Sequence, residues 1–212
     1  MIKVKQNILQ DSILLSLPDK YPPLIKRLLA ARPADAGNED LLLRDIIPVS
    51  DFIEIYEAIP LLRSHYNNEI LIYGDYDVDG ATSISLLFLG LKDLNFSNVK
   101  YYVPNRMTMG YGFSLLGLED LLKDHKPRLI ITVDNGMSSF DAVEVARKKG
   151  IDILIVDHHL EGPRRPSANV IVNPNLNNTS FSGKNLAAVG VVFYLLSALG
   201  KELDVKNVAL NY

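Results

Sequence analysis

The segment Ile70-Leu71-Ile72-Tyr73-Gly74-Asp75-Tyr76-Asp77-Val78-Asp79-Gly80 contains the transition on which the fold depends. A short apolar run is ended by a glycine, and three aspartates follow at alternate positions before the next apolar pattern begins. That next pattern, Ala81–Leu94, has its apolar residues at helical spacing. The segment therefore predicts a buried strand, an acidic turn and a helix in direct succession.

The alternation of strand and helix continues toward the C-terminus. Further strands are predicted at Val99–Val103, Leu129–Val133, Ile151–Val156 and Val170–Val172. Further helices are predicted at Leu115–Leu122, Ser139–Lys149 and Ala187–Leu199, and an Asn- and Ser-rich loop at 173–183. Because the strands are apolar on both faces and single helices join them, the pattern predicts an α/β fold with an open, mostly parallel sheet and helices on both faces.

The first part of the chain has a different sequence pattern, without the alternation of strands and helices. Prolines recur there between two short helical patterns, Leu24–Ala31 and Asp51–Ile59, and the second is predicted to be capped by Ser50 or Asp51. We therefore expect a helical N-terminal extension over residues 1–69, followed by the α/β domain over residues 70–212.

The composition is that of an ordinary globular protein, with 48% hydrophobic and 22% charged residues. The absence of cysteine excludes disulfides, thiolate metal sites and cysteine nucleophiles. No apolar stretch approaches a membrane span and no apolar signal core follows the N-terminal lysines, so a cytoplasmic protein without a membrane partner is the default expectation. The formal net charge of −3 argues weakly against a nucleic-acid partner, but five of the acids fall in the motifs below and the remainder is slightly basic.

Three of the predicted strands end in carboxylates. Ile70–Tyr73 is followed by Asp75, Asp77 and Asp79, Leu129–Val133 by Asp134, and Ile151–Val156 by Asp157-His158-His159. In an open parallel sheet, ligands bind at the carboxyl ends of the strands. We therefore expect five aspartates and two histidines, which lie far apart in the sequence, to converge on one crevice.

Such a concentration of carboxylates is unfavourable unless cations compensate it. Carboxylate oxygens with an imidazole nitrogen suit Mn²⁺, or Mg²⁺ where fewer histidines contact the ion. Two such ions a few ångströms apart can polarise a phosphodiester and generate hydroxide to attack it. The residue types therefore predict phosphoester hydrolysis by metal-activated water, without a protein nucleophile.

Each of these residues also has a purely structural interpretation. An aspartate at a strand end is often only a helix cap, and a histidine pair is more often structural than functional. The spacing of Asp75, Asp77 and Asp79 also imitates the start of an EF-hand, but that loop needs a glutamate at its twelfth position, where Leu86 stands, and a helix before it. The three acidic strand ends taken together favour a metal or phosphate site.

The motifs resemble those of a known family. Asp157-His158-His159 resembles the motif that names the DHH phosphoesterases, and the segments 74–82 and 132–136 resemble its RecJ branch of single-stranded-DNA-specific exonucleases. Further similar segments are Tyr21–Leu24, Ala30–Arg32, Pro104–Arg106, Gly110–Gly112, Val172–Pro174 and Ala187–Val191. The resemblance covers essentially the whole chain.

The resemblance implies a role for individual residues. It implies a two-metal site for Mn²⁺ or Mg²⁺ with ligands Asp77, Asp79, Asp134 and His158, in which Asp134 is the bridge and Asp75 an extra ligand. His159 would face the scissile phosphate as a donor or acid. Arg106 would contact the nucleic-acid backbone, with a solvated loop residue as the alternative, and Tyr111 would be a base-stacking platform or only a turn residue.

The function that the resemblance implies is 5′-to-3′ exonuclease activity on single-stranded DNA in repair and recombination. Chains of the RecJ branch continue past a Val-Ala-Leu-Gly segment to another metal-binding aspartate, whereas here Val208-Ala209-Leu210 is followed by Asn211-Tyr212. We therefore expect a truncated catalytic part with weak or no activity. Two alternatives stay open, a DHH phosphodiesterase acting on short oligonucleotides, cyclic dinucleotides or pyrophosphate, and a non-catalytic scaffold.

Overall fold

A computed structural model describes Asp19, residues 22–31 and residues 46–205. The chain divides into two compact units, Met1–Ile46 and Ile47–Tyr212. In the first unit the described helix is α2, Pro23–Ala31, which confirms the helical pattern predicted there. The predictions that involve Tyr21, Arg32 and the segment 208–212 lie outside the described residues.

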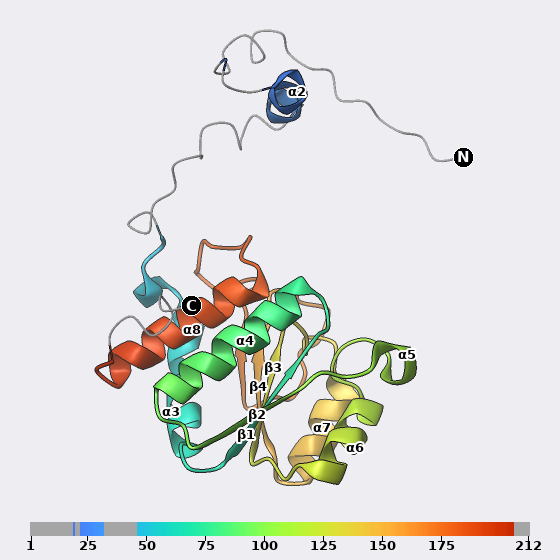
Figure 1. Cartoon of the computed structure of the whole chain (residues 1–212). Coiled ribbons are helices and arrows are strands. Elements are labelled where there is room, and N and C mark those ends of the chain that lie inside the picture. The colour runs from blue at the N-terminus through green and yellow to red at the C-terminus, as the bar shows by residue number, and fades with distance from the viewer. Residues whose placement is uncertain (1–18, 20–21, 32–45, 206–212) are drawn as a thin grey trace. The chain divides into compact units, whose positions relative to one another are not determined.

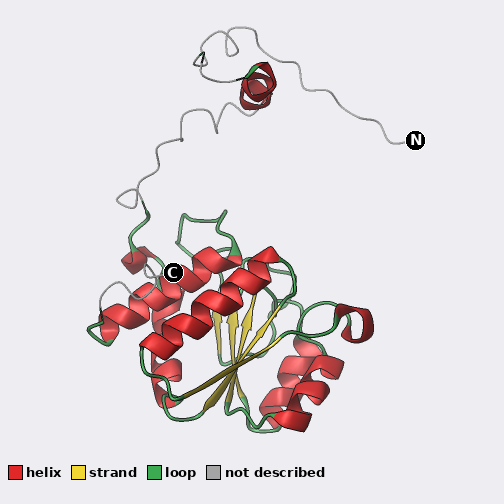
Figure 2. Ribbon diagram, viewed as in Figure 1, coloured by secondary structure: helices red, strands yellow, loops and turns green. Residues whose placement is uncertain are grey.

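The second unit contains a five-stranded sheet in which every strand pairs in parallel with its neighbours, in the order β2-β1-β3-β4-β5 (Figures 1 and 2). The strands are β1 (Glu69–Gly74), β2 (Asn98–Tyr102), β3 (Leu129–Val133), β4 (Asp152–Val156) and β5 (Val170–Val172). The predicted α/β fold with a parallel sheet is confirmed. Among the described helices, none is long and apolar enough to cross a membrane.

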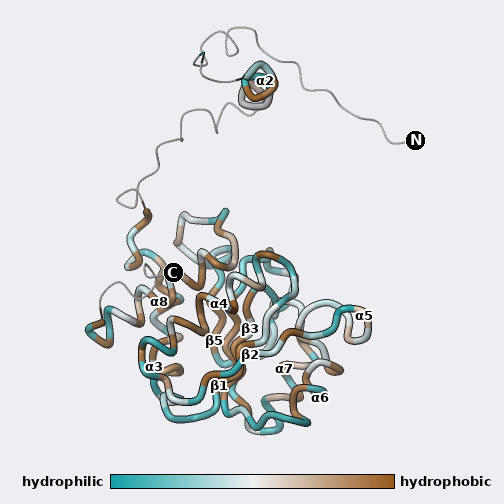
Figure 3. Tube along the Cα trace, in the orientation of Figure 1, coloured by the Kyte–Doolittle hydropathy of each residue, from teal (hydrophilic) through white to brown (hydrophobic). Residues whose placement is uncertain are grey.

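Helices cover both faces of this sheet (Figure 1). One face packs against α3 (Glu54–Ser64), α4 (Val78–Asp93) and α8 (Ala188–Glu202), and the other against α6 (Leu115–Asp124) and α7 (Phe140–Lys148). Alternate residues of β1 serve the two faces, since Ile70 and Ile72 belong to the first core cluster and Leu71 and Tyr73 to the second. This double burial explains the uninterrupted apolar runs of the strands, visible as the hydrophobic centre of Figure 3.

Helix α3 belongs to the α/β unit, which differs from the extension expected over residues 1–69. Its residues Ile55 and Leu62 and the preceding Phe52 have no exposed surface and lie in the first core cluster. The boundary between the compact units therefore falls at Ile46–Ile47. The amphipathic pattern of α3 was visible in the sequence, but the pattern does not say which surface it covers.

The ends of α3 also differ from the prediction. Neither Ser50 nor Asp51 caps it, because Val49–Asp51 form a separate 3₁₀ turn, η3, and the helix begins at Glu54. Pro60 lies inside the helix, which continues to Ser64. Pro60 is on the exposed side, where water can pair with the carbonyl group that a proline leaves without a donor.

One helix was not predicted. Arg106–Met109 form a four-residue helix, α5, between β2 and α6, and the side chain of Asn105 caps it by accepting a hydrogen bond of 3.0 Å from the amide of Met107. A single turn of four residues is too short for periodicity to reveal it in the sequence.

The register of the sheet aligns the strand ends. Gly74 pairs with Val133, Val133 pairs with Val156, and Val156 pairs with Val172. The residues that follow these four positions are Asp75, Asp134, Asp157 and Asn173. The polar residues after four neighbouring strands therefore form one row along the carboxyl edge of the sheet.

Candidate metal centre

The acidic turn after β1 is held in place by close packing of backbone on backbone. Asp77 caps α4, and its Oδ1 accepts a hydrogen bond of 2.9 Å from the amide of Gly80. A Cβ atom at Gly80 would lie 2.5 Å from the carbonyl oxygen of Asp75, so only glycine allows α4 to begin this close to the strand end. Gly80 thus allows the three aspartates of this turn to lie at the carboxyl end of β1.

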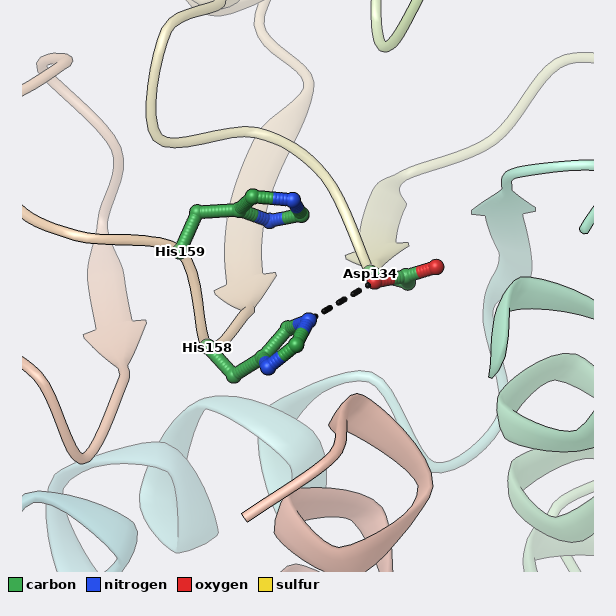
Figure 4. Close-up of side chains that lie close together, drawn as sticks. All are labelled: Asp134, His158 and His159. Carbon is green, nitrogen blue, oxygen red and sulfur yellow. Dashed lines mark ion pairs between the residues drawn. The ribbon is translucent and has the colours of Figure 1, made fainter. Parts of the chain in front are cut away.

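Two groups of potential ligand atoms lie at the row of strand ends, each with its atoms within 4.8 Å of one another. The first group comprises Asp75, Asp77 and Asp134, and the second comprises Asp134, His158 and His159. Figure 4 shows the second group, with both imidazole rings coming from the turn after β4. Asp134 belongs to both groups, and the structure therefore places this carboxylate between the acidic turn and the histidine pair.

Asp134 has an unusual environment for a carboxylate. Only 2% of its surface is exposed, and its φ of 60° lies in the left-handed region, which an aspartate tolerates better than most side chains. Burial, followed by the charges of Asp79 and Asp77, raises the pKa of Asp134 to about 7. The backbone thus holds a carboxylate where its negative charge is disfavoured in the metal-free protein.

His158 faces these carboxylates with one ring nitrogen. Its Nε2 lies 3.2 Å from Oδ1 of Asp134, the contact drawn in Figure 4, and 3.5 Å from Oδ2 of Asp79. Its Nδ1 lies 3.0 Å from the carbonyl oxygen of Leu186. A carbonyl oxygen can only accept, so Nδ1 donates in this contact, and Nε2 is the ring nitrogen left to face the acidic cluster, where it can bind a cation.

Asp79, one of the predicted ligands, belongs to neither group of ligand atoms. Its carboxylate accepts hydrogen bonds from two amides at the start of α8, from Ala188 at 2.8 Å and from Val189 at 2.9 Å. Asp79 nevertheless remains beside the site through its contact with His158.

Asp157 positions His159 and the surrounding turn. It is 1% exposed, and its Oδ1 accepts hydrogen bonds from the amides of His158 and His159 and, at 2.7 Å, from Nδ1 of His159, while Oδ2 accepts from the amide of Met137. Burial acts to raise the pKa of Asp157, but the hydrogen bond and charge of His159 outweigh it and lower this pKa. The same hydrogen bond raises the pKa of His159. Asp157 was expected in the crevice as one of the five aspartates, but the sequence assigned it no role.

Asn173 completes the row and was not predicted as a site residue. It is fully buried, and its Nδ2 donates a hydrogen bond of 2.9 Å to the carbonyl oxygen of His159. Its position directly after β5 was the available signal, because the same position after the neighbouring strands is occupied by aspartate.

The two predicted nucleic-acid contacts lie at the rim. The guanidinium carbon of Arg106 lies 4.7 Å from the ring centroid of Tyr76, so an exposed cation sits on the acidic turn itself. Tyr111 is 55% exposed, and its hydroxyl lies 3.3 Å from Nε2 of His159. Burial and the nearby aspartates, Asp75 first, raise the pKa of Tyr111 to about 12, so its hydroxyl keeps its proton at neutral pH.

The residues at these strand ends fit a divalent cation. Oδ2 of Asp75 is buried and has no hydrogen-bond partner within the described part of the chain. Asp134 is a buried carboxylate whose ionisation the neighbouring acids oppose. Hard oxygen ligands with one imidazole nitrogen are the set that Mn²⁺ accepts, and Mg²⁺ accepts the oxygens. A bound cation would satisfy the unpaired oxygen and compensate the crowded charge together.

The raised pKa of Asp134 leads to a prediction for the metal-free protein. Since its pKa in the folded state is about 7, against an ordinary value of 3.8, stability present below about pH 4 is lost as the pH rises through 7. We expect the melting temperature of the Asp134→Asn variant to exceed that of the parent by a margin that grows between about pH 5 and about pH 8 in EDTA. A constant difference across this range would show that Asp134 titrates normally.

Comparisons with known proteins give these residues a family context. Residues 69–211 match the DHH family, N-terminal domain. The single-stranded-DNA-specific exonuclease RecJ of Escherichia coli (strain K12) is 39% identical in an alignment of 203 residues that covers 92% of this chain and 35% of that protein. The protein of the same name from Haemophilus influenzae is 43% identical over 180 residues, 84% of this chain and 31% of that protein.

A solved structure is also similar. The crystal structure of exonuclease RecJ bound to manganese matches with a TM-score of 0.68 and 27% sequence identity, over 77% of this chain and 43% of that chain. The chain spans about a third of the length of the two curated relatives.

Proposed function

Because this chain belongs to the DHH family, we propose that it hydrolyses phosphodiester bonds of single-stranded DNA from the 5′ end, with Mn²⁺ or Mg²⁺ bound at the carboxyl edge of its sheet. Membership confirms the resemblance found in the sequence. The choice of substrate rests on the RecJ relatives and on the exposed Arg106 at the rim, and we place the activity in DNA repair and recombination.

One observation carries the proposal, namely that Asp134 belongs to both groups of ligand atoms. A carboxylate between two groups of donors is the arrangement that a pair of cations a few ångströms apart requires. We assign Asp75, Asp77 and Asp134 to one cation and Asp134, His158 and Asp79 to the other. Bound there, the cations would polarise the scissile phosphate and lower the pKa of a water molecule that attacks it.

The side chains outside this ligand set then act on the substrate. Asp157 fixes His159 through Nδ1, so that Nε2 faces the open side of the site near Tyr111. The hydrogen bond that His159 donates to Asp157 raises the pKa of His159 and so favours the protonated ring, which can donate a proton to an oxygen of the phosphate or of the leaving group. A hollow of about 270 Å³, lined among others by Tyr111, His159 and Phe140, gives room for a sugar and base beside that phosphate.

The test uses the 212-residue chain with Mn²⁺ and 5′-labelled DNA. Because the sequence predicts at most weak activity for this chain, we expect slow release of labelled mononucleotide from a long single strand as the first product, little product from a duplex, and none in EDTA. Preferential cleavage of dinucleotides or cyclic dinucleotides would favour the alternative DHH activity. No cleavage of any of these substrates at high protein concentration would contradict the proposed catalytic function and favour a scaffold.

Arg106 gives a prediction on substrate binding. Replacement by alanine should weaken binding of a single strand about fivefold irrespective of sequence, and should reduce the slope of log K against log salt by about 0.7, as expected for one lost phosphate contact. The measurement is fluorescence anisotropy in EDTA. Arg128→Ala is the matched control, because this exposed arginine precedes β3 at the opposite edge of the sheet. An equal loss of affinity for the single strand in the two variants would show that Arg106 contributes only to the net charge of the protein and makes no specific phosphate contact.

A further inference from the structure

We infer that the entrance of α8, defined as Leu186–Val189, is the positioning element of the proposed metal centre, because it holds Asp79 and His158 from one rigid segment. The inference rests on the proposed function in that it concerns the same cations. It adds residues that act only through their backbone groups, and it couples the affinity for metal to the docking of α8.

The first contact is made with Asp79. The first amides of a helix have no partner within the helix, and the residue before α8 is Ala187, whose side chain has no acceptor to offer them. Asp79 lies 109 positions earlier in the sequence than Ala188 and supplies one carboxylate oxygen to the amide of Ala188 and the other to that of Val189. The carboxylate therefore has a fixed orientation, and each of its oxygens keeps a lone pair for a cation.

The second contact is made with His158. The carbonyl oxygen of Leu186 accepts from Nδ1 and thereby selects the tautomer whose Nε2 is free to bind metal. Histidines that bind metals commonly donate their other ring nitrogen to a carbonyl or carboxylate in this way. The distance of 3.5 Å between Nε2 of His158 and Oδ2 of Asp79 shows that the two held groups face each other.

The entrance is rigid because α8 is part of the core. Ala188, Val191 and Leu195 have no exposed surface. A Cβ atom at Gly90 of α4 would lie 2.5 Å from a terminal carbon of the Leu196 side chain, so α8 packs directly on α4 at this glycine. The entrance cannot move away from α4, which carries Asp79 in its first turn, unless this packing is lost.

The test removes one amide and leaves the helix intact. Ala188 is the first residue of α8, where proline is well tolerated, and Ala187 has φ −68° and ψ 160°, the conformation that precedes proline readily. Ala188→Pro therefore deletes the hydrogen bond to Asp79 and places the ring carbon Cδ where the amide hydrogen was, which displaces the carboxylate while the helix backbone changes little. Ala188→Val is the matched control, because it adds a similar volume and keeps the amide.

We expect Ala188→Pro to raise the Kd for Mn²⁺, measured by titration calorimetry, by about 10-fold or more, and Ala188→Val to keep the parental Kd within about twofold. Equal Kd values for the parent and the proline variant would overturn the inference and leave the proposed function standing. Equal losses in both variants would assign the effect to packing and overturn it as well. A parent that binds no Mn²⁺ would contradict the proposed function, and the inference with it.

A second measurement does not depend on the folding of any variant. In the metal-free parent above pH 8, ¹⁵N chemical shifts of the imidazole nitrogens report which one carries the proton. We expect Nδ1 of His158, the nitrogen that faces Leu186, to carry a proton whether or not Nε2, which faces the aspartates, carries one as well. Protonation at Nε2 alone would show that the carbonyl group does not hold Nδ1 as the donor, and would overturn this half of the inference.

Discussion

Replacing Asp134 by asparagine is expected to lower the affinity for Mn²⁺ by more than about 100-fold and, in the same variant, to raise the melting temperature of the metal-free protein at pH 8. Loss of the shared carboxylate should exceed the roughly 10–100-fold loss that follows removal of a group behind a ligand. The gain in stability has the opposite sign because the ionised carboxylate is disfavoured in the folded state, where burial raises its pKa to about 7.

Opposite signs distinguish this result from simple misfolding, which would lower both quantities. Asparagine also tolerates the left-handed conformation at this position, whereas alanine at a φ of 60° would cost about 1–2 kcal/mol and obscure the gain. Titration calorimetry and thermal melts in EDTA provide the two measurements. Asp124→Asn, an exposed position on α6, controls for the loss of one charge. Parental affinity in Asp134→Asn would remove Asp134 from the ligand set.

Alanine variants of the two adjacent histidines are expected to lose different properties, metal affinity for His158 and turnover for His159. His158→Ala should raise the Kd for Mn²⁺ by at least about 10-fold, because Nε2 of His158 faces Asp134 and Asp79. His159→Ala should leave that Kd within about twofold and lower kcat by about 10²–10⁴-fold with KM held, because a proton donor acts in the transition state. His159 is held by Asp157 and faces Tyr111 instead.

Three measurements separate these roles from a structural one. Metal affinity, melting temperature and kcat on a 5′-labelled single strand are compared for the two variants and the parent. If both rings only hold the loop, both variants lose melting temperature and the kinetic difference disappears. Equal loss of metal binding in both variants would refute the assignment of His158 to the metal and His159 to the phosphate.

The core of the site was predictable because its side chains follow apolar runs. Each buried strand of a parallel sheet is a continuous hydrophobic stretch, and its end is visible where a polar residue interrupts it. Asp75, Asp134 and Asp157 stand at such interruptions, and pairing of the strands brings them together. The parallel sheet and the convergence of these aspartates could therefore be predicted from local apolar patterns, together with the rule that ligands bind at the carboxyl ends of parallel strands.

The supporting contacts could not be predicted in the same way. The amides of Ala188 and Val189 and the carbonyl of Leu186 are backbone groups, which every residue carries, so the residue types there give no sign of their role. Similarly, Phe52 stacks on Phe181 with the ring centroids 4.3 Å apart, a contact between distant segments that fixes α3 to the α/β unit. Such contacts depend on how the elements dock, and periodicity within one element does not contain that information.

The large sequence separation between Asp79 and the amides of α8 that it contacts also determines the order in which the site can form during translation. The ribosome makes the chain from the N-terminus, so the acidic turn, Asp134 and the two histidines leave the exit tunnel before Ala188 does. Until then the carboxylate of Asp79 lacks the amides that it contacts in the folded protein. In a nascent chain, the cation assigned to Asp134, His158 and Asp79 would therefore be fully held only after α8 has emerged and docked, whereas the group of Asp75, Asp77 and Asp134 does not include a residue that α8 holds.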